Sequence, residues 1–284
     1  LEDTLARLRL DHLLGEDILG RRGFRFDIRI RLGSGPYALG EETAVINACE
    51  GLPAVPRPRP PYPTAEGYRG WPTVVHGAET FCCVAAILEE GSGAFSELGT
   101  PESTGTKLLS LSGDCRAPGL YELPFGVTVD HVLGLAGAED ASAVFAGGPN
   151  PGLLDPSRFG RQVSFEDVST SGPLVAIGPG RDPVALLADF ARFYLEATAS
   201  FPGEQDHDDD RARIGGVLDA LPEGRATPED LALLEEAARR MSHDRALGFG
   251  RAPARLVLNS LGSFRDQVEA RLAGGKKRAR AASA

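Results

Sequence analysis

The chain has 284 residues, 42% of them hydrophobic and 25% charged, which is enough for about two domains with sizeable apolar cores. Thirty basic against forty acidic residues give a net charge of −10, which disfavours a nucleic acid or an anionic membrane as partner. No stretch approaches the roughly 20 apolar residues of a membrane span, and the first ten residues lack the order of a secretion signal. These features predict a cytoplasmic protein without direct membrane insertion.

The chain opens with a leucine stripe over residues 1–14 that predicts a short amphipathic helix. Residues 24–32 then alternate between apolar and charged side chains, which predicts a strand with one buried face. Residues 33–38 formally match the G-x-G-x-x-A turn of dinucleotide-binding units. The following VPRPRPPYP cannot form the second strand of such a unit, so an ordinary Rossmann unit is excluded.

A helix is predicted to begin near Gly40 and to end at Gly51 as its C-cap. Glu41 and Glu42 fall in its first turn, where the helix dipole favours acidic side chains. Taken alone, the two acids indicate ordinary helix chemistry.

The four cysteines show neither C-x-x-C spacing nor a histidine placed to complete a zinc site. Cys82 and Cys83 lie inside the apolar run FCCVAAIL, which predicts buried free thiols. The basic residues at 276–280 predict a solvated, disordered tail.

Strands are predicted at 108–111, 120–123 and 143–146, with a helix capped by Thr128 between the second and third. This order suggests a small β-grasp domain, and a further strand follows at 174–177. The GGPNPG turn at 147–152 is interpreted as an ordinary loop rather than an anion site.

Three apolar stripes predict C-terminal helices, the first capped by Asp182 and the second beginning at Thr227. The acidic segment GEQDHDDDR lacks the spacing and glycine turn of a calcium loop, so an exposed loop is predicted there. The five histidines show no catalytic arrangement, and no residue is assigned a catalytic or metal-ligating role.

Residues 33–51, GSGPYALGEETAVINACEG, resemble the G-A-Y-I-C-G-E-E-T-A-L stretch of a known family. This is the NADH-binding flavoprotein subunit of respiratory complex I, with the flavin subunits of NAD-linked hydrogenases and formate dehydrogenases. LPAVPRPRPPYPTAEGYRGWPTVVHGAET is similar to the family's P-R-x-K-P-P-F-P and G-x-P-T-x-V-N-N-V-E-T runs. GTKLLSLSGDCRAPGLYELPFGVTVDHVL, LADFARFYLEATAS and LGSFRDQVEARL extend the resemblance in order to residue 272.

The resemblance implies that FMN and NAD(H) stack in a pocket bordered by this segment. Glycine lets the backbone approach a ring, helix-start N–H groups meet polar ligand atoms, and an acid accepts from a hydroxyl. The residues that it assigns to the edge of the pocket are Tyr37, Gly40, Glu41, Glu42, Val75 and Thr80.

Two departures from the family bear on the cofactors. His76 and Gly77 replace the family's Asn-Asn pair, and the glycine-rich flavin-phosphate loop, which precedes the matched segments, does not occur in these 284 residues. Since Leu1 is not an initiator, we expect an incomplete N-terminus, and hence an incomplete site, rather than a lost domain. The cysteines that bind the family's four-iron, four-sulfur cluster are also missing, so no cluster is expected. Their positions hold Ala199, Pro202, Gln205 and Leu247.

The expected fold class is α/β, with a partial Rossmann-like flavin domain, a small β-grasp domain resembling soluble-ligand-binding domains, and a C-terminal helical bundle. The corresponding ranges are 1–103, 104–182 and 183–273, followed by the tail at 274–284.

Two functions fit. The first is a divergent NADH dehydrogenase-type subunit that passes hydride from NADH to FMN and electrons to a partner, and is inactive as an isolated chain. The resemblance implies a thioredoxin-fold, ferredoxin-like subunit as that partner. The alternative is a non-catalytic scaffold that keeps the fold without cofactors.

Overall fold

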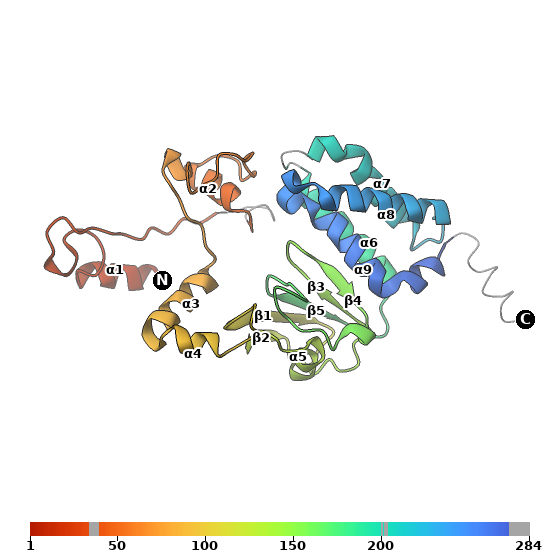
Figure 1. Ribbon diagram of the computed structural model, residues 1–284, viewed down its shortest axis with the longest axis horizontal. Helices are drawn as coiled ribbons and strands as arrows, with labels where there is room; N and C mark the ends of the chain where they lie inside the picture. Colours follow the sequence, from red (N-terminus) through yellow and green to blue (C-terminus); the bar gives the residue numbers. More distant parts are fainter. Residues whose placement is uncertain (34–39, 200, 202–203, 273–284) are drawn as a thin grey trace, which may run out of the picture.

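The computed structural model describes residues 1–33, 40–199, 201 and 204–272, and it is a mixed α/β structure. The N-terminal part contains α1 (Glu2–Leu10), α2 (Glu42–Glu50), α3 (Ala78–Glu90) and α4 (Ser92–Ser96). The middle part contains β1 (Thr106–Gly113), β2 (Gly119–Pro124), α5 (Val129–Ala136), β3 (Ala143–Ala146), β4 (Gly152–Leu154) and β5 (Pro173–Ile177). The C-terminal part contains α6 (Pro183–Thr198), α7 (Asp208–Ala220), α8 (Pro228–His243) and α9 (Ala252–Glu269). Figure 1 shows the N-terminal part beside the sheet and the helical bundle above it.

The sheet has the strand order β2-β1-β5-β3-β4. β1 and β2 form an antiparallel hairpin, and β5 lies between β1 and β3, parallel to the first and antiparallel to the second. In the β-grasp arrangement, the last strand pairs with the first, and a helix connects the first hairpin to the next strand. Here β5 pairs with β1, and α5 connects the β1–β2 hairpin to β3. The predicted β-grasp domain is therefore confirmed, and β4 adds an edge strand that the sequence did not indicate.

Both faces of the sheet are covered at β3, and the side chains of this strand alternate between them. Val144 and Ala146 pack with α5 on one face, whereas Ala143 and Phe145 pack with the helical bundle on the other. Phe145 stacks on Phe190 of α6, with ring centroids 3.9 Å apart. Burial on both faces explains why β3 is an uninterrupted apolar run.

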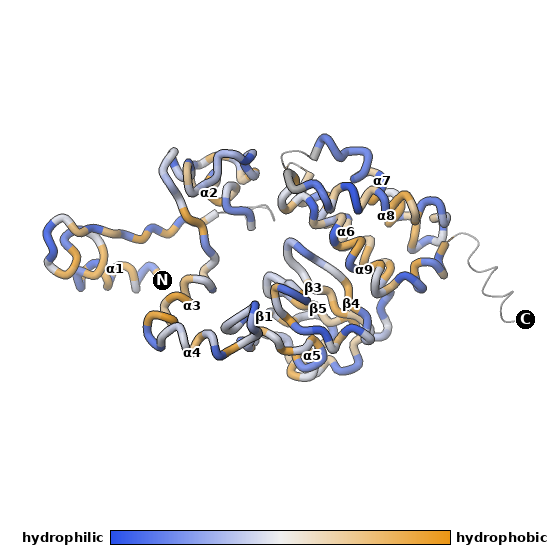
Figure 2. Tube along the Cα trace, in the orientation of Figure 1, coloured by the Kyte–Doolittle hydropathy of each residue, from blue (hydrophilic) through white to orange (hydrophobic). Residues whose placement is uncertain are grey.

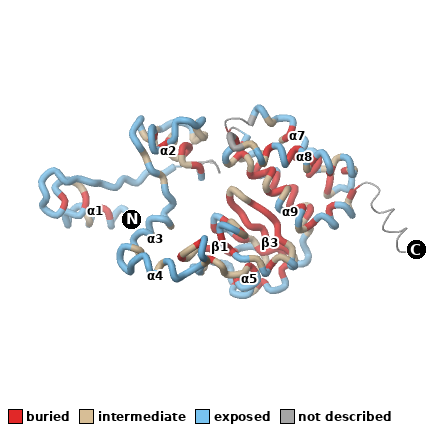
Figure 3. Tube along the Cα trace, in the orientation of Figure 1, coloured by how far each residue is buried: buried red, intermediate tan, exposed pale blue. Residues whose placement is uncertain are grey.

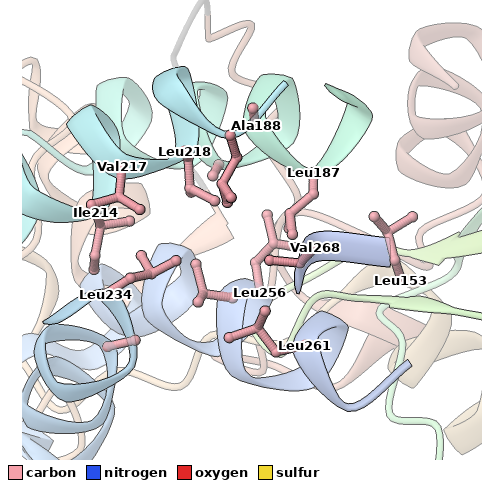
Figure 4. Close-up of a cluster of buried hydrophobic side chains, with 14 of the residues drawn as sticks. Leu153, Leu187, Ala188, Ile214, Val217, Leu218, Leu234, Leu256, Leu261 and Val268 are labelled. Atoms are coloured by element: carbon pink, nitrogen blue, oxygen red, sulfur yellow. The ribbon is translucent and has the colours of Figure 1, made fainter. Parts of the chain in front are cut away.

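The four C-terminal helices share one apolar core, which Figure 4 shows as a cluster of leucines, isoleucine and valines pointing inward. The three predicted helices are confirmed, and Asp182 and Thr227 cap α6 and α8 as expected. The predicted acidic loop is wrong, because Asp208–Asp210 form the first turn of α7. Acidic side chains suit that position, since the N-terminal end of a helix carries partial positive charge.

The strand predicted at residues 24–32 does not form. Phe26 makes an isolated bridge to Gly15, and no other strand pairing involves this segment within the described residues. Its large side chains, Phe24, Phe26, Ile28, Ile30 and Leu32, are all exposed, and the segment is pale blue in Figure 3. Alternation creates an apolar face, but a strand also needs a neighbour that accepts and donates its backbone hydrogen bonds.

Helix α3 also leaves its apolar side chains exposed. It is among the most hydrophobic segments of the N-terminal part in Figure 2, yet it has no buried residue. The prediction that Cys82 and Cys83 are buried is therefore wrong: Cys82 is exposed and Cys83 intermediate, although both are free thiols, as predicted. Glu79 ties α3 to β1 by pairing with Lys107 and by accepting from Leu108 N at 2.6 Å.

No helix among the described residues combines the length and the hydropathy of a membrane span.

Candidate functional site

The N-terminus of α2 is built around the Glu41 carboxylate. Glu41 is the N-cap residue, and its Oε2 accepts from Thr43 N at 2.8 Å and from Ala44 N at 2.9 Å. The side chain is buried, so these bonds lie out of competition with water. Gly51 closes the helix with a φ of +82°, as predicted. Glu41 therefore holds the helix start in place and has one carboxylate oxygen committed to it.

Arg59 is the residue of this site that sequence reasoning missed. Its Nη2 pairs with Glu41 and lies 2.8 Å from Glu42 Oε1, so one guanidinium bridges both acids. Arg57 binds the other end of the helix, donating to the Asn47 amide oxygen Oδ1 and to Glu50 Oε2, both at 2.7 Å. The signal in the sequence was charge alone: Arg57 and Arg59 lie in the proline-rich segment that follows a helix carrying Glu41, Glu42 and Glu50.

The edge residues assigned by resemblance fall into two groups. Gly40, Glu41 and Glu42 meet at the start of α2, with the Glu42 side chain 37% exposed and open to a ligand. Val75 precedes α3 and Thr80 lies on it, and Figure 1 shows α3 apart from α2. No hydrogen bond or ion pair within residues 40–199 joins Val75 or Thr80 to the α2 start. Tyr37 lies outside the described residues.

The α2 helix rests on two aromatic rings from the bundle. Ala44 and Phe201 form a buried apolar cluster, and Phe249 packs against it. A Cβ on Gly40 would lie 3.6 Å from the Phe249 ring, so the helix start is already in close range of that ring. The two phenylalanines thus fix the candidate edge to the C-terminal part.

The two loops that carry Phe201 and Phe249 also contain the positions where the family holds its cluster. Ala199 and Gln205 flank Phe201, and Leu247, which is buried, lies near Phe249. Pro202 lies outside the described residues. An iron–sulfur cluster requires cysteine thiolates, and every cysteine of the chain lies at or before Cys115. In the described part of the chain, no three His, Cys, Asp or Glu side chains gather in a metal-binding group either. The donor set therefore does not fit a cluster.

A clamp of charged side chains ties the first of these loops to α8. His207 Nε2 lies 3.0 Å from Asp244 Oδ2, and His207 Nδ1 lies 3.4 Å from Asp210 Oδ2. Asp210 also accepts from the Arg240 guanidinium, which lowers the pKa of that carboxyl. Hydrogen bonding to Asp244 raises the pKa of His207; partial burial opposes this, and Asp210 adds to the rise. The sequence alone assigned no role to His207, because both of its carboxylate partners come together only in the folded chain.

The His207→Gln variant is expected to be destabilised in a pH-dependent manner. A raised folded-state pKa means that the stabilisation is complete below the unfolded value, about 6.5, and declines as pH rises through the folded value. The loss in free energy of unfolding should therefore be larger at about pH 5.5 than at about pH 8.5, as measured by urea unfolding.

His243→Gln provides the matched control. His243 is exposed on α8, and its Nδ1 lies 2.7 Å from the Arg239 carbonyl oxygen rather than beside a carboxylate. Equal pH dependence of the two variants would contradict the clamp.

Comparison with known proteins shows clear relatives, although no protein-family model matches the chain. The alpha subunit of the NAD-reducing hydrogenase HoxS of Cupriavidus necator is 38% identical over 267 residues, covering 93% of this chain and 44% of the relative. The NADP-reducing hydrogenase subunit HndC of Solidesulfovibrio fructosivorans is 31% identical and covers 91% of the chain and 54% of the relative. An NADH-quinone oxidoreductase subunit of Escherichia coli is 31% identical and covers 95% of the chain and 63% of the relative.

The structural comparison agrees. The crystal structure of an NAD+-reducing NiFe hydrogenase in its H2-reduced state matches with a TM-score of 0.80 at 38% identity, over 87% of this chain and 44% of that one. The chain thus spans between 44% and 63% of the length of these relatives.

Proposed function

Because the chain belongs to the family of NADH-binding flavoprotein subunits found in NAD-linked hydrogenases and complex I, we propose that it serves NADH oxidation in a multi-subunit redox complex. More finely, it is a divergent NADH dehydrogenase-type subunit that binds FMN and NAD(H). The observation that carries this proposal is the start of α2, where a fixed helix end and a partly exposed carboxylate adjoin Gly40.

FMN, when bound, supplies the acceptor for the hydride of NADH. This chain's part is to form one edge of the pocket, from Tyr37, Gly40, Glu41, Glu42, Val75 and Thr80. Gly40 lies against the Phe249 ring at the start of α2, and Glu42 offers an acceptor to a ribose or flavin hydroxyl. Glu41 and Arg59 hold the edge rather than contact the ligand, since the first caps α2 and the second bridges the acids.

We place no iron–sulfur cluster in this subunit. The bundle lacks the thiolates, and an apolar contact between Phe201, Phe249 and Ala44 occupies the loops that would supply them. Without a cluster of its own, this subunit would pass electrons directly to a partner, for which we propose the thioredoxin-fold, ferredoxin-like subunit of such a complex, in the cytoplasm. We also keep the division at residues 103 and 182 as the proposed domain boundaries.

A non-catalytic scaffold is the second candidate. It is favoured by the loss of the family's cluster cysteines together with its amide pair, for which His76 and Gly77 stand here. It predicts that the β-grasp domain and the bundle dock a partner while the α2 edge binds no flavin.

An FMN titration followed by flavin fluorescence separates the two candidates. It uses this chain and, if its gene encodes a longer protein, that complete protein as well. Saturable FMN binding by the complete protein supports the redox role if the Glu42→Ala variant binds more weakly. The Glu139→Ala variant, changed at a remote surface residue, should bind as the unmodified protein does. NADH oxidation is then the next assay. No saturable binding by either form would refute it and leave the scaffold.

A further inference from the structure

A polar cavity of about 210 Å³ lies where α9 crosses the β4 edge of the sheet, far along the chain from the α2 edge. It is lined by Asn150 and Gly152 around the GGPNPG turn, by the loop after β4, and by one side of α9. Its polar lining consists of Asn150, Arg158, Arg161, Asp167, Ser169 and Asn259.

The walls of the cavity are fixed by bonds between β4 and α9. Leu153 N donates to the buried Ser260 Oγ at 3.0 Å, and Asn259 Nδ2 donates to Pro151 O at 2.9 Å. Two glycines permit this close approach: a Cβ on Gly152 would lie 2.9 Å from the Asn259 Cβ, and one on Gly262 would lie 3.2 Å from Arg158 Nη2. The cavity is therefore formed before any ligand arrives.

Its two guanidinium groups are only partly occupied by the protein. Arg158 Nη2 donates to Gly262 O at 2.6 Å, and Asp155 lies 3.6 Å from Arg158 Nε, beyond hydrogen-bond distance. Arg161 donates from Nε to Asp167 Oδ1 at 2.7 Å, and its Nη2 lies 2.6 Å from the same oxygen and 3.3 Å from Asp167 O. A guanidinium has five N–H donors, and Nη1 of neither arginine donates to any residue that the structure describes.

The charge of the lining also favours an anion. Asp167 is the one acid among the lining residues and pairs with Arg161, while Asp155, just outside the lining, forms a longer ion pair of 3.6 Å with Arg158. The lining itself thus holds two positive charges and one negative charge in a chain of net charge −10. The volume lies below the ~300 Å³ at which drug-sized ligands begin, which limits the ligand to a few heavy atoms. Guanidinium forks match the geometry of carboxylate and phosphate oxygens.

We propose that this cavity between β4 and α9 binds a small molecule through a carboxylate or phosphate group, held by Arg158 and Arg161 and oriented by the Asn150 and Asn259 amides. The site is independent of the proposed NADH oxidation. A ligand seated there touches both the sheet and the bundle, so its binding stabilises their junction.

Calorimetric titration of the full chain with inorganic phosphate and, separately, with malonate tests the proposal, with sodium chloride at matched ionic strength as reference. Saturable heat with one probe alone identifies the phosphate or the carboxylate as the group recognised. The Arg158→Gln variant is expected to bind on the order of tenfold more weakly, because a charge-assisted bond is lost. The control is Arg116→Gln, which changes an arginine of an exposed surface ion pair in the same domain. This variant should bind the probes as the unmodified chain does.

Gly262→Ala serves as a variant that keeps the fold, since alanine is the better helix former and its methyl group presses on Arg158. Gly216→Ala on α7, where a Cβ would meet nothing within 4 Å, is its control. The first should weaken binding several-fold and the second should not.

Chemical modification of the unmutated chain gives an independent readout. Phosphate or malonate should slow phenylglyoxal modification of Arg158 and Arg161 and leave that of Arg116 unchanged, as followed by mass spectrometry of peptides. Absence of saturable heat, equal binding by the Arg158 and Arg116 variants, or equal protection of all three arginines would each overturn the proposal.

Discussion

Replacing Leu256 with alanine is expected to lower the free energy of unfolding by about 3 to 5 kcal/mol. Leu256 lies in the centre of the bundle with none of its surface exposed, among side chains of four helices and the sheet. The bundle has no cysteine to bind a cluster, so packing of this kind must hold it together. Truncation removes buried methyl groups and leaves a cavity that fixed helices cannot fill.

Urea unfolding of the Leu256→Ala and Leu233→Ala variants measures this effect. Leu233 lies on α8 of the same bundle but is 38% exposed, so its truncation should cost about 1 kcal/mol or less. Similar losses for the two variants would mean that the centre of the bundle is loosely packed. The comparison requires that the unfolding free energy of each variant depends on urea concentration as steeply as that of the unmodified chain.

Replacing Glu41 with alanine is expected to cost about 2 kcal/mol of stability, since the substitution removes the cap of α2 and leaves the Arg59 guanidinium with one carboxylate fewer. The same change should weaken FMN binding by the protein from the complete gene on the order of tenfold, because a frayed helix start no longer presents its N–H groups. Thermal unfolding and flavin fluorescence measure the two effects.

Glu42→Ala is the matched variant, since Glu42 pairs with the same arginine but does not cap the helix. Its exposed ion pair contributes little, so we expect a loss of less than about 1 kcal/mol. Weakened flavin binding by Glu42→Ala at nearly unchanged stability would assign it a contact with the ligand. If Glu41→Ala unfolds no more easily than Glu42→Ala, the capping role of Glu41 is wrong.

Features encoded over a few residues were predictable from the sequence. The α2 helix, with Gly51 as its C-cap, and the α8 start at Thr227 follow from local capping rules. The β-grasp order also followed, because turn residues separate its short strands and its helix begins after a recognisable cap position. Thr128 does occupy that position, although its side chain makes no capping hydrogen bond.

Features that depend on distant partners were not predictable in the same way. The strand at 24–32 failed because its alternation says nothing about whether a neighbouring strand is present. Arg59 was missed because it contacts acids that lie 17 and 18 residues earlier. A loop was predicted where α7 begins, because the buried position of Asp210 depends on its ion pair with Arg240, thirty residues away.

The contact of Ala44 with Phe201 and Phe249 makes the order of α2 depend on the bundle. The helix is nine residues long, too short to persist by itself in water. The two rings hold α2 together with the Arg57 and Arg59 contacts, so its backbone amides should exchange faster with solvent hydrogen whenever the rings leave the cluster. A local opening of the loops at the ends of the bundle helices releases α2 as well, without global unfolding. The edge proposed for the nucleotide and the loops that lack the cluster cysteines thus open and close as one cooperative unit.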